Sequence, residues 1–348
     1  MSIKFTEITE DELINYTELI LKLDIDIYQT PQWLIINKES PCDQINCILI
    51  EFDNNIAFIP LIKRHIKNTP FFDLMTPYGY GGIAFNQNAD QHFKENILCL
   101  LMDYLQQTDY VSIFLRLHPF LNQDLKTSPA LMPNGVTLNV PLALGHDTLF
   151  SRYRSGHRYD IRKNLKQEDI EVSIDNDFAH LDDFIDVYHQ TMQRLNATRF
   201  YFFDKTYFYT MHALLGDKLK LVVVKKANKV IGAALFLLQS NIIQYHLSGN
   251  SQDGRKYQPA KLIIDHMIQW GIAHNYKFLH LGGGLGGRKD ELYEFKKGFA
   301  AEELDFYTAR LVINQNVYEL LCQQQGYDKQ MIEDKLNFFP LYRNSLMA

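Results

Sequence analysis

Short apolar runs separated by polar turns recur along the chain and predict a protein rich in β-strands. In the first half, the runs 45–52 and 56–65 flank the turn sequence Asp53-Asn54-Asn55, which predicts a hairpin. Apolar residues at helical spacing predict a helix over 91–108. The remaining elements expected here are a short strand at 71–75, a glycine-rich loop at 77–82 and a strand at 110–117.

The second half repeats this order of elements. The expected elements are strands at 218–226, 229–239 and 242–248, a polar loop at 249–258, a helix at 259–274 and a strand at 276–281. Corresponding elements lie about 170 residues apart, which predicts two homologous mixed α/β modules rather than a short-period repeat. We expect one domain at 1–145, a second at 146–313, and a C-terminal helical segment at 314–348 that packs on the core.

Composition and charge narrow the class of protein. The chain has 348 residues, of which 46% are hydrophobic and 13% aromatic, enough to form substantial cores. A net charge of −6 argues against general binding to nucleic acids or to membrane surfaces, so any anion site must be a local patch. No metal-ligand motif is present among the scattered histidines, and no metal site is expected.

The cysteines and the longest apolar run indicate where in the cell the protein is expected. The four cysteines lack metal-ligand spacing, and three lie in apolar segments, so we expect buried, reduced thiols in a cytoplasmic protein. The first residues lack the pattern of a signal peptide. The longest uncharged apolar run, 230–238, is too short to cross a bilayer, so no transmembrane segment is expected.

A glycine-rich loop follows the last strand of the second half. Five glycines between Gly282 and Gly287 would let another molecule approach the backbone, and Arg288 and Lys289 follow at once. The spacing matches a dinucleotide fingerprint, but too few elements remain downstream for that fold, and the Walker pattern fails. A flexible surface loop is the alternative to a ligand-binding strand end.

A basic segment joins the two halves. Within 151–167, Arg154, Arg158, Arg162 and Lys166 recur every four residues, which places four cations along one helical face. We expect this helix to bind an anion; a solvated charged face is the alternative.

The order of strands, loop and helix in the second half resembles the core of GNAT acyltransferases. In that family the pyrophosphate of the acyl donor lies on the helix after the third strand, where unpaired N–H groups favour phosphate. Here that segment carries Arg255, Lys256, Pro259 and Ala260. Only Arg255 and Ala260 could match the ends of the family's Gln/Arg-x-x-Gly-x-Gly/Ala pattern, and an exposed basic loop is the alternative.

Several passages, taken in order, resemble the Fem-type peptidoglycan aminoacyltransferases and their BioF2-like relatives. These passages are Tyr28–Trp33, Pro77–Gly82, the basic segment, Tyr188–Phe203, His280–Gly284, Phe295–Phe299 and Phe338–Arg343. The resemblance implies two tandem GNAT-like domains with a cleft between them. It also implies transfer of an acyl or aminoacyl group to an amine, with acyl-CoA or aminoacyl-tRNA as co-substrate and no tightly bound cofactor. The helical arm that some members insert is missing, because 177–216 is too short for it.

Candidate site residues follow from this resemblance and from their chemistry. Lys296 matches the family's Phe-Lys pair and is our candidate catalytic residue, stabilising the oxyanion from the edge of an amphipathic helix whose buried face carries Leu292, Phe295 and Phe299. Lys297 should point toward solvent. The expected substrate-binding residues are Tyr78, Tyr80, Arg154, Arg158, Arg199 and Tyr201, and the expected cofactor-binding residues are Arg255, Lys256, Ala260, Gly283 and Gly284.

We therefore expect an acyl- or aminoacyltransferase that acts on an amine of an anionic cell-envelope precursor or a nucleotide-linked amino sugar. Its partners would be a small anionic substrate and, for an aminoacyl donor, the acceptor end of tRNA, with a lipid-linked precursor placing it at the inner membrane face. The alternative is a non-catalytic anion-binding module built on a degenerate GNAT pair.

Overall fold

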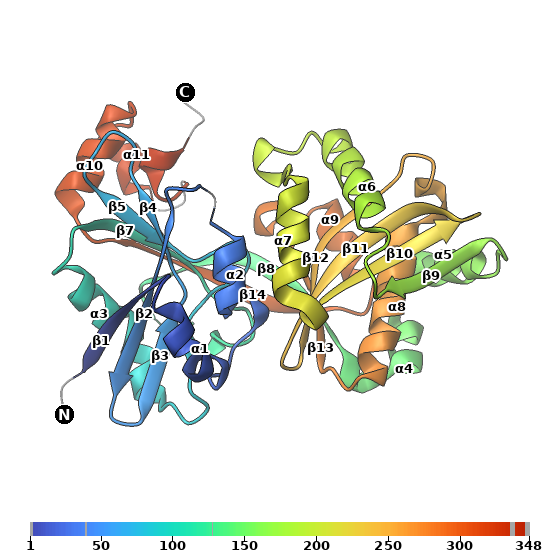
Figure 1. Cartoon of the computed structure of the whole chain (residues 1–348), viewed down its shortest axis with the longest axis horizontal. Helices are drawn as coiled ribbons and strands as arrows, with labels where there is room; N and C mark the ends of the chain where they lie inside the picture. Colours follow the sequence, from blue (N-terminus) through green and yellow to red (C-terminus); the bar gives the residue numbers. More distant parts are fainter. Residues whose placement is uncertain (1–2, 39, 127, 335–337, 345–348) are drawn as a thin grey trace. The chain divides into compact units, whose positions relative to one another are not determined.

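The chain forms two compact units. The computed structural model describes residues 3–38, 40–126, 128–334 and 338–344 (Figure 1). Unit 1 comprises 1–134 and 305–348, and unit 2 comprises 135–304. The expected boundaries, at 145 and 313, lie about ten residues after the ones observed: the chain enters unit 2 at residue 135 and returns to unit 1 at residue 305.

Unit 1 is built on a mixed sheet with the strand order β6-β3-β2-β4-β5-β7-β14, and β1 pairs with β2. Strands β5 and β7 are parallel, and helix α3 (Gln91–Leu105) connects them. The strand expected at 56–65 is two strands, because Pro60 has no N–H to donate. The strands are β1 (Lys4–Thr9), β2 (Gln44–Phe52), β3 (Asn55–Ile59), β4 (Ile62–His65), β5 (Phe72–Met75), β6 (Ala84–Phe85), β7 (Tyr110–Arg116) and β14 (Glu302–Val312).

The core of unit 1 follows the alternation of side chains along β2. Ile48 and Ile50 pack in one cluster with the apolar face of α3, whereas Cys47 and Leu49 pack in another with α1 (Leu13–Leu21) and α2 (Pro31–Ile36). The sheet is therefore covered on both faces by helices from its own unit.

The C-terminal helices belong to unit 1, and the first of them begins at Gln315, close to the expected start of the C-terminal segment at 314. Helix α10 (Gln315–Gln324) packs on β7, where Tyr318 and Leu321 meet Val111, and α11 (Lys329–Glu333) packs on α10. Buried Asp73 of β5 accepts hydrogen bonds from Arg343 and Tyr342, which fastens the end of the described chain to the sheet.

Unit 2 has the strand order β8-β13-β12-β11-β10-β9. Strands β12 and β13 are parallel, with helix α8 (Pro259–Ala273) between them in sequence, and the other neighbours are antiparallel. The arrangement therefore matches β5, α3 and β7 of unit 1. The strands are β8 (Leu131–Pro141), β9 (Ile170–Asp175), β10 (Leu219–Lys226), β11 (Lys229–Gln239), β12 (Ile242–Asn250) and β13 (Phe278–Gly282).

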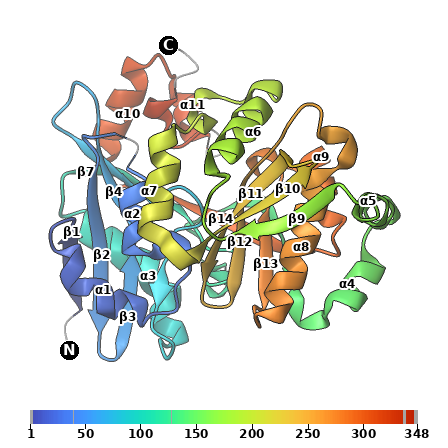
Figure 2. The ribbon, with the colours of Figure 1, turned by 45° about the vertical axis from the view of Figure 1, so that its right-hand side comes forward.

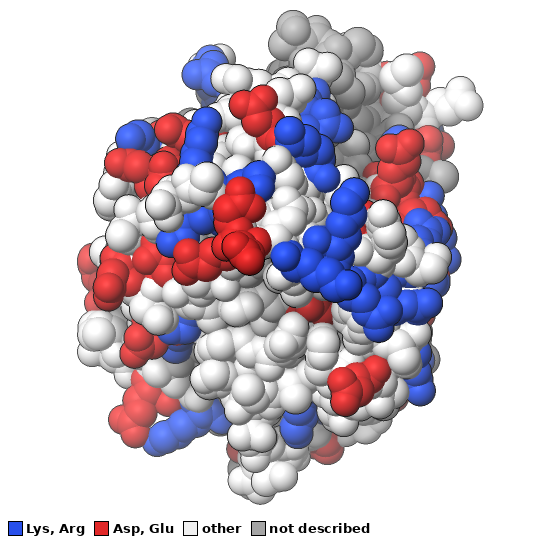
Figure 3. Space-filling model, turned by 90° about the vertical axis from the view of Figure 1, so that its right-hand side faces the viewer, with Lys and Arg blue, Asp and Glu red and all other residues white. Residues whose placement is uncertain are grey.

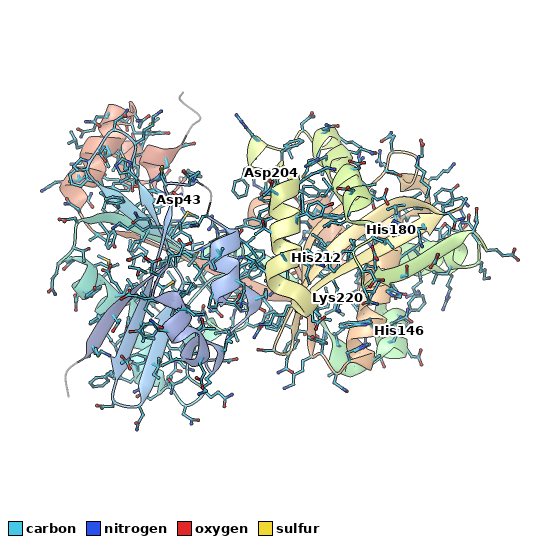
Figure 4. All side chains as sticks on the ribbon, in the orientation of Figure 1. Asp43, His146, His180, Asp204, His212 and Lys220 are labelled. Carbon is cyan, nitrogen blue, oxygen red and sulfur yellow. The ribbon has the colours of Figure 1, made fainter. Side chains whose placement is uncertain are left out.

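Helices cover both faces of the unit 2 sheet (Figures 1 and 2). Val222 and Val224 of β10 pack with Ile263 and Met267 of α8, while α6 (Leu181–Arg194) and α7 (Lys205–Leu215) lie against strands β10 to β12. Helix α7 begins at Asp204, whose carboxylate accepts a hydrogen bond from the Tyr207 amide (Figure 4).

The basic segment is two helices rather than one. Helix α4 (His146–Arg152) ends before Tyr153, and α5 (Ser155–Leu165) begins after Arg154, whose backbone is extended at φ −50° and ψ 137°. Helix α5 packs on α8 and on the edge strand β9. His146, labelled in Figure 4, lies at the start of α4. It bonds to the buried carboxylate of Asp265 on α8 at 2.9 Å.

In each unit, the strand that follows the parallel pair in sequence joins the sheet of the other unit. Strand β8 follows β7 in sequence but pairs with β13 of unit 2. Strand β14 follows β13 but pairs with β7 of unit 1. The two units thus exchange equivalent edge strands.

Two expectations about thiols and membranes can be compared with the structure. Cys47 and Cys322 are buried, but Cys42 and Cys99 are exposed. The expectation of buried thiols was therefore wrong for Cys42 and for Cys99, which lies on the outer face of α3. Across the described ranges, none of the helices has the length and apolar character that a membrane crossing requires.

Gly249 lets α6 approach β12. A Cβ at this position would lie 2.4 Å from the backbone of Val187 and Tyr188. We expect Gly249→Ala to destabilise the protein by about 1–3 kcal/mol in urea denaturation, because the helix has to move. Gly156→Ala in α5 is the matched control, since a Cβ there meets nothing within 4 Å, and it should be neutral or stabilising by up to about 1 kcal/mol. Equal effects of the two substitutions would contradict this account.

Candidate functional site

A fork between β12 and β13 lies at the centre of unit 2. The two parallel strands pair from Ile242–Phe278 to Gln244–His280, whereas β12 continues to Asn250 and β13 to Gly282. On its other side, β12 pairs with β11 and carries a bulge: Leu235 and Phe236 of β11 lie opposite Leu247 and Tyr245 of β12, which gives β12 one extra residue at this point. The carboxyl ends of two adjacent strands therefore diverge where α8 begins.

The start of α8 is held close to the sheet. A Cβ at Gly232 of β11 would lie 2.6 Å from the Pro259 ring, so only glycine permits this approach. Pro259 occupies the first helical position, and Gln258 before it has a left-handed backbone. Among the described residues, no side chain caps this helix start. Its amides and partial positive charge are thus directed at the end of β12.

Cations gather at this helix start. The predicted residues Arg255 and Lys256 are exposed in a short 3-10 turn before α8, and Ala260 lies in its first turn. Arg194, at the end of α6, was missed by the sequence analysis. Burial lowers the pKa of Arg194, and the charge of Arg255 lowers it further. The Arg194 guanidinium donates to the Asn250 carbonyl at the end of β12, the strand that leads into the Arg255 turn.

Lys296 is buried on α9 (Glu291–Lys297), with 8% of its surface exposed. Its Nζ donates a hydrogen bond of 2.7 Å to the Gly283 carbonyl at the exit of β13. Burial lowers its pKa to about 8, and Asp290 opposes this change. The expected position at the edge of the buried face was wrong: Tyr293 and Lys296 face inward, and Leu292 is 46% exposed.

Lys297 is exposed, as expected, but its ammonium is paired. Its Nζ donates to Glu303 at 2.5 Å and to the Tyr293 hydroxyl at 2.9 Å. Hydrogen bonds from Lys289, Lys297 and Tyr293 lower the pKa of Glu303 to about 2. Lys297 therefore belongs to a surface ion-pair cluster that fastens α9 to the start of β14.

The glycine-rich loop packs against its own unit. A Cβ on Gly283 would lie 2.7 Å from the Val136 carbonyl, and one on Gly284 would lie 2.1 Å from the Arg288 carbonyl. Close contacts within the chain thus account for both glycines, although the sequence suggested an approaching ligand. Their predicted role in cofactor binding stays a prediction, with Gly283 contributing the carbonyl that Lys296 contacts.

Arg154 and Arg158 occupy different positions from those expected of a uniform stripe. Arg154 precedes α5 and forms an exposed ion pair with Glu294 of α9 at 3.2 Å. Arg158 donates to the carbonyls of Ser151 and Tyr153 at 2.7 and 2.6 Å, which caps α4. Arg154 thus lies beside the helix that carries Lys296, whereas Arg158 holds α4 and α5 together.

The four other predicted substrate residues lie in two places. In unit 1, Tyr78 accepts a hydrogen bond from the Trp33 indole through its carbonyl, and the Tyr80 ring packs against Tyr28. In unit 2, Arg199 is exposed in the 3-10 turn after α6, and Tyr201 is half-buried beside it. Their substrate contacts stay predictions.

No three potential metal ligands cluster anywhere in the described ranges.

Comparison with known proteins shows which domain family and which solved structures the chain resembles. Residues 151–297, all within unit 2, match the family model of an acetyltransferase (GNAT) domain. The crystal structure of FemX is similar over 91% of this chain and 99% of its own, with a TM-score of 0.68 and 15% identity. The structure of a conserved protein of unknown function from Bacteroides thetaiotaomicron is similar over 89% of this chain and 100% of its own, with a TM-score of 0.58 and 14% identity.

A further structural relative is the C-terminal DUF2156 domain of a protein assigned as a lysylphosphatidylglycerol synthetase from Agrobacterium fabrum. Its TM-score is 0.52 at 12% identity, over 90% of this chain and 95% of its own. No curated protein matches the sequence. At these identities the structural similarities concern the fold.

Residues 151–297 therefore correspond to a GNAT acetyltransferase domain, which lies within unit 2. The predicted tandem GNAT-like organisation is confirmed, and the Fem-type resemblance holds at the level of the fold.

Proposed function

We propose that this protein transfers an acyl or aminoacyl group from a phosphate-bearing carrier to a primary amine of an anionic acceptor. The observation that carries the proposal is the buried Lys296 at the exit of β13, next to the fork that opens toward the start of α8. A buried ammonium and a cationic helix start supply the two things that such a donor needs, namely a charge for its carbonyl oxygen and a site for its phosphates.

The reaction is an aminolysis. The neutral amine attacks the carbonyl carbon, a C–N bond forms, and the C–S bond of a thioester or the C–O bond of an ester breaks. The proton lost by the amine leaves with the thiol or alcohol. Negative charge develops on the carbonyl oxygen as the amine adds, and a fixed hydrogen-bond donor stabilises it most when water is excluded.

Lys296 has the properties of that donor. Below a pH of about 8 it is protonated, and one of its three N–H groups is held by the Gly283 carbonyl. That bond fixes the position of Nζ. Within the described chain, the Gly283 carbonyl is the hydrogen-bond acceptor that Nζ contacts, which leaves two N–H groups for a donor carbonyl.

The carrier would bind at the α8 start. Arg255, Lys256 and the first-turn amides around Ala260 would hold its phosphates, with Arg194 alongside. Both co-substrates carry phosphates: in acyl-CoA the pantetheine arm joins them to the reacting carbonyl, and in aminoacyl-tRNA the terminal ribose does. The cationic helix start is therefore compatible with either co-substrate. Arg154, beside α9, and the exposed Arg199 would contact an anionic acceptor, such as a nucleotide-linked amino sugar or a lipid-linked envelope precursor.

The donor site can be tested by calorimetry with CoA. We expect Arg255→Gln combined with Lys256→Gln to weaken CoA binding by about 10- to 100-fold at low salt, because two charge-assisted contacts are lost. Lys22→Gln combined with Lys67→Gln removes the same charge from exposed positions of unit 1 and should leave the affinity unchanged. Equal affinities in both double variants would rule out the α8 start.

If the wild-type protein does not bind CoA, the same variants are assayed for transfer from charged tRNA. Products formed with nucleotide-linked amino sugars or lipid-linked precursors are identified by mass spectrometry. Binding of a donor without transfer to any amine would instead favour the non-catalytic alternative.

A further inference from the structure

Helix α5 has a buried face and an exposed basic face. His157, Ile161 and Asn164 are buried toward the rest of unit 2. Tyr159, Arg162, Lys163 and Lys166 occupy positions i, i+3, i+4 and i+7, so they form one stripe on the outside. They line an open groove along the helix, formed by Ser155, Arg158, Tyr159, Arg162, Lys163 and Lys166. We call this surface the α5 basic face.

The cations of this face are not neutralised locally. Asp160, the acidic residue of α5, pairs with Lys261 of α8 at 2.5 Å, and Arg154 pairs with Glu294. In the described part of the chain, no carboxylate lies within ion-pair distance of Arg162, Lys163 or Lys166. Figure 3 shows Lys and Arg side chains in a band on the side of the molecule that carries α5. Like charges at this spacing destabilise a helix, so an external anion would relieve them.

Apolar side chains are exposed among these cations. Tyr159 is 64% exposed and Leu165 is 50% exposed. The Lys163 ammonium lies 5.7 Å from the centre of the Tyr159 ring, and the Arg162 guanidinium lies 5.1 Å from that of Phe150. Cations that lie over aromatic rings, beside an exposed aliphatic side chain, suit a boundary between charged headgroups and hydrocarbon.

We propose that the α5 basic face docks the protein peripherally on an anionic lipid surface. Arg152, at the end of α4, extends the cluster to five cations with Arg158, Arg162, Lys163 and Lys166, a number typical of segments that bind anionic lipids. The chain as a whole has a net charge of −6, so this local patch would orient it on the membrane. Leu165 distinguishes lipid from nucleic acid, because a phosphate backbone offers an exposed leucine no apolar partner. The proposal does not depend on the acyl-transfer chemistry.

Vesicle co-sedimentation tests this proposal. The full chain should bind vesicles that mix phosphatidylglycerol with phosphatidylcholine, and bind phosphatidylcholine alone much more weakly. Replacing Arg162, Lys163 and Lys166 with Gln should lower the partition coefficient by about 100-fold, at about fivefold for each cation near the surface. Leu165→Ser should lower binding further in high salt, where electrostatic attraction is screened.

A matched triple variant controls for net charge. Lys22→Gln, Lys67→Gln and Lys329→Gln remove three exposed cations of unit 1 and should leave partitioning within a fewfold of wild type. Equal losses in both triple variants, with the circular dichroism spectra unchanged, would overturn the proposal. So would the absence of wild-type binding to the mixed vesicles, or complete displacement from them by stoichiometric single-stranded RNA.

Discussion

Lys296→Met is expected to lower turnover by a factor of ~10²–10³, the usual effect of removing one oxyanion donor. The measurement is the rate of acyl transfer with the donor and acceptor that the binding assays identify. Lys297→Met is the neighbouring control, because Lys297 contacts Glu303 and Tyr293 rather than the Gly283 carbonyl. Equally small losses from the two substitutions would refute the catalytic role of Lys296.

The pH dependence separates an ammonium from a neutral amine at this position. If Lys296 acts as a cation, kcat/KM should fall as the pH rises through about 8, its pKa in the folded protein. Lys296→Arg keeps the charge and should move this fall beyond the accessible range, since guanidinium does not lose its proton. A rate that instead rises through pH 8 and loses that rise in Lys296→Met would assign Lys296 as a base.

Stability should change in the opposite direction to activity. The folded pKa of Lys296, about 8, lies below its ordinary value of 10.5, so the unfolded chain binds more protons between these values and stability rises with pH across them. The charged, buried form therefore costs up to roughly 3 kcal/mol at neutral pH, offset by about 1 kcal/mol from the bond to Gly283. Lys296→Met should accordingly melt at a higher temperature than the wild type at pH 7.

Asp73→Ala should destabilise the protein by about 3–5 kcal/mol in urea denaturation, the usual effect of removing one partner of a buried ion pair. The Asp73 carboxylate has no exposed surface and bridges Arg64 at 2.9 Å and Arg343 at 2.5 Å. Tyr342 also donates to it and bonds to Ser112 of β7. Without Asp73, two partly buried guanidinium groups lose their counterion and the C-terminal segment loses its attachment to β5.

An exposed pair provides the control for this prediction. Glu51→Gln removes the partner of Lys4, whose side chain is 67% exposed, and should cost at most about 1 kcal/mol. A loss below about 1 kcal/mol for Asp73→Ala would mean that the C-terminal helices are held by apolar packing alone.

The sequence predicted the elements whose signals are local. The turn at Ala227-Asn228 and the apolar runs around it gave β10 and β11, and Pro259 marked the start of α8. The break at Pro60 could have been predicted too, because proline removes one ladder hydrogen bond. The strands β8 and β14 could not be assigned to their units, since nothing in a strand's own sequence names its distant partner.

The candidate site was predicted in chemical type but not in geometry. Apolar side chains lie on more than one side of α9. The side that is buried carries Tyr293 and leads to Phe299 just after the helix, whereas Leu292 is exposed. Burial of Lys296 therefore depends on tertiary packing that no periodicity shows. Arg194 lies on a different helix from Arg255, 61 positions away in the sequence, so their proximity also had no local signal.

The exchange of β8 and β14 has a consequence for the origin of this chain. If each module stood on its own, the strand after its crossover unit would either return to its own sheet or pair with a second copy, and the second arrangement is a reciprocally swapped homodimer. Fusion of two such genes would produce the present connectivity without any rearrangement of strands. It would also explain why neither module closes its sheet from contiguous sequence: unit 1 receives its last strand only after the ribosome has synthesised all of unit 2.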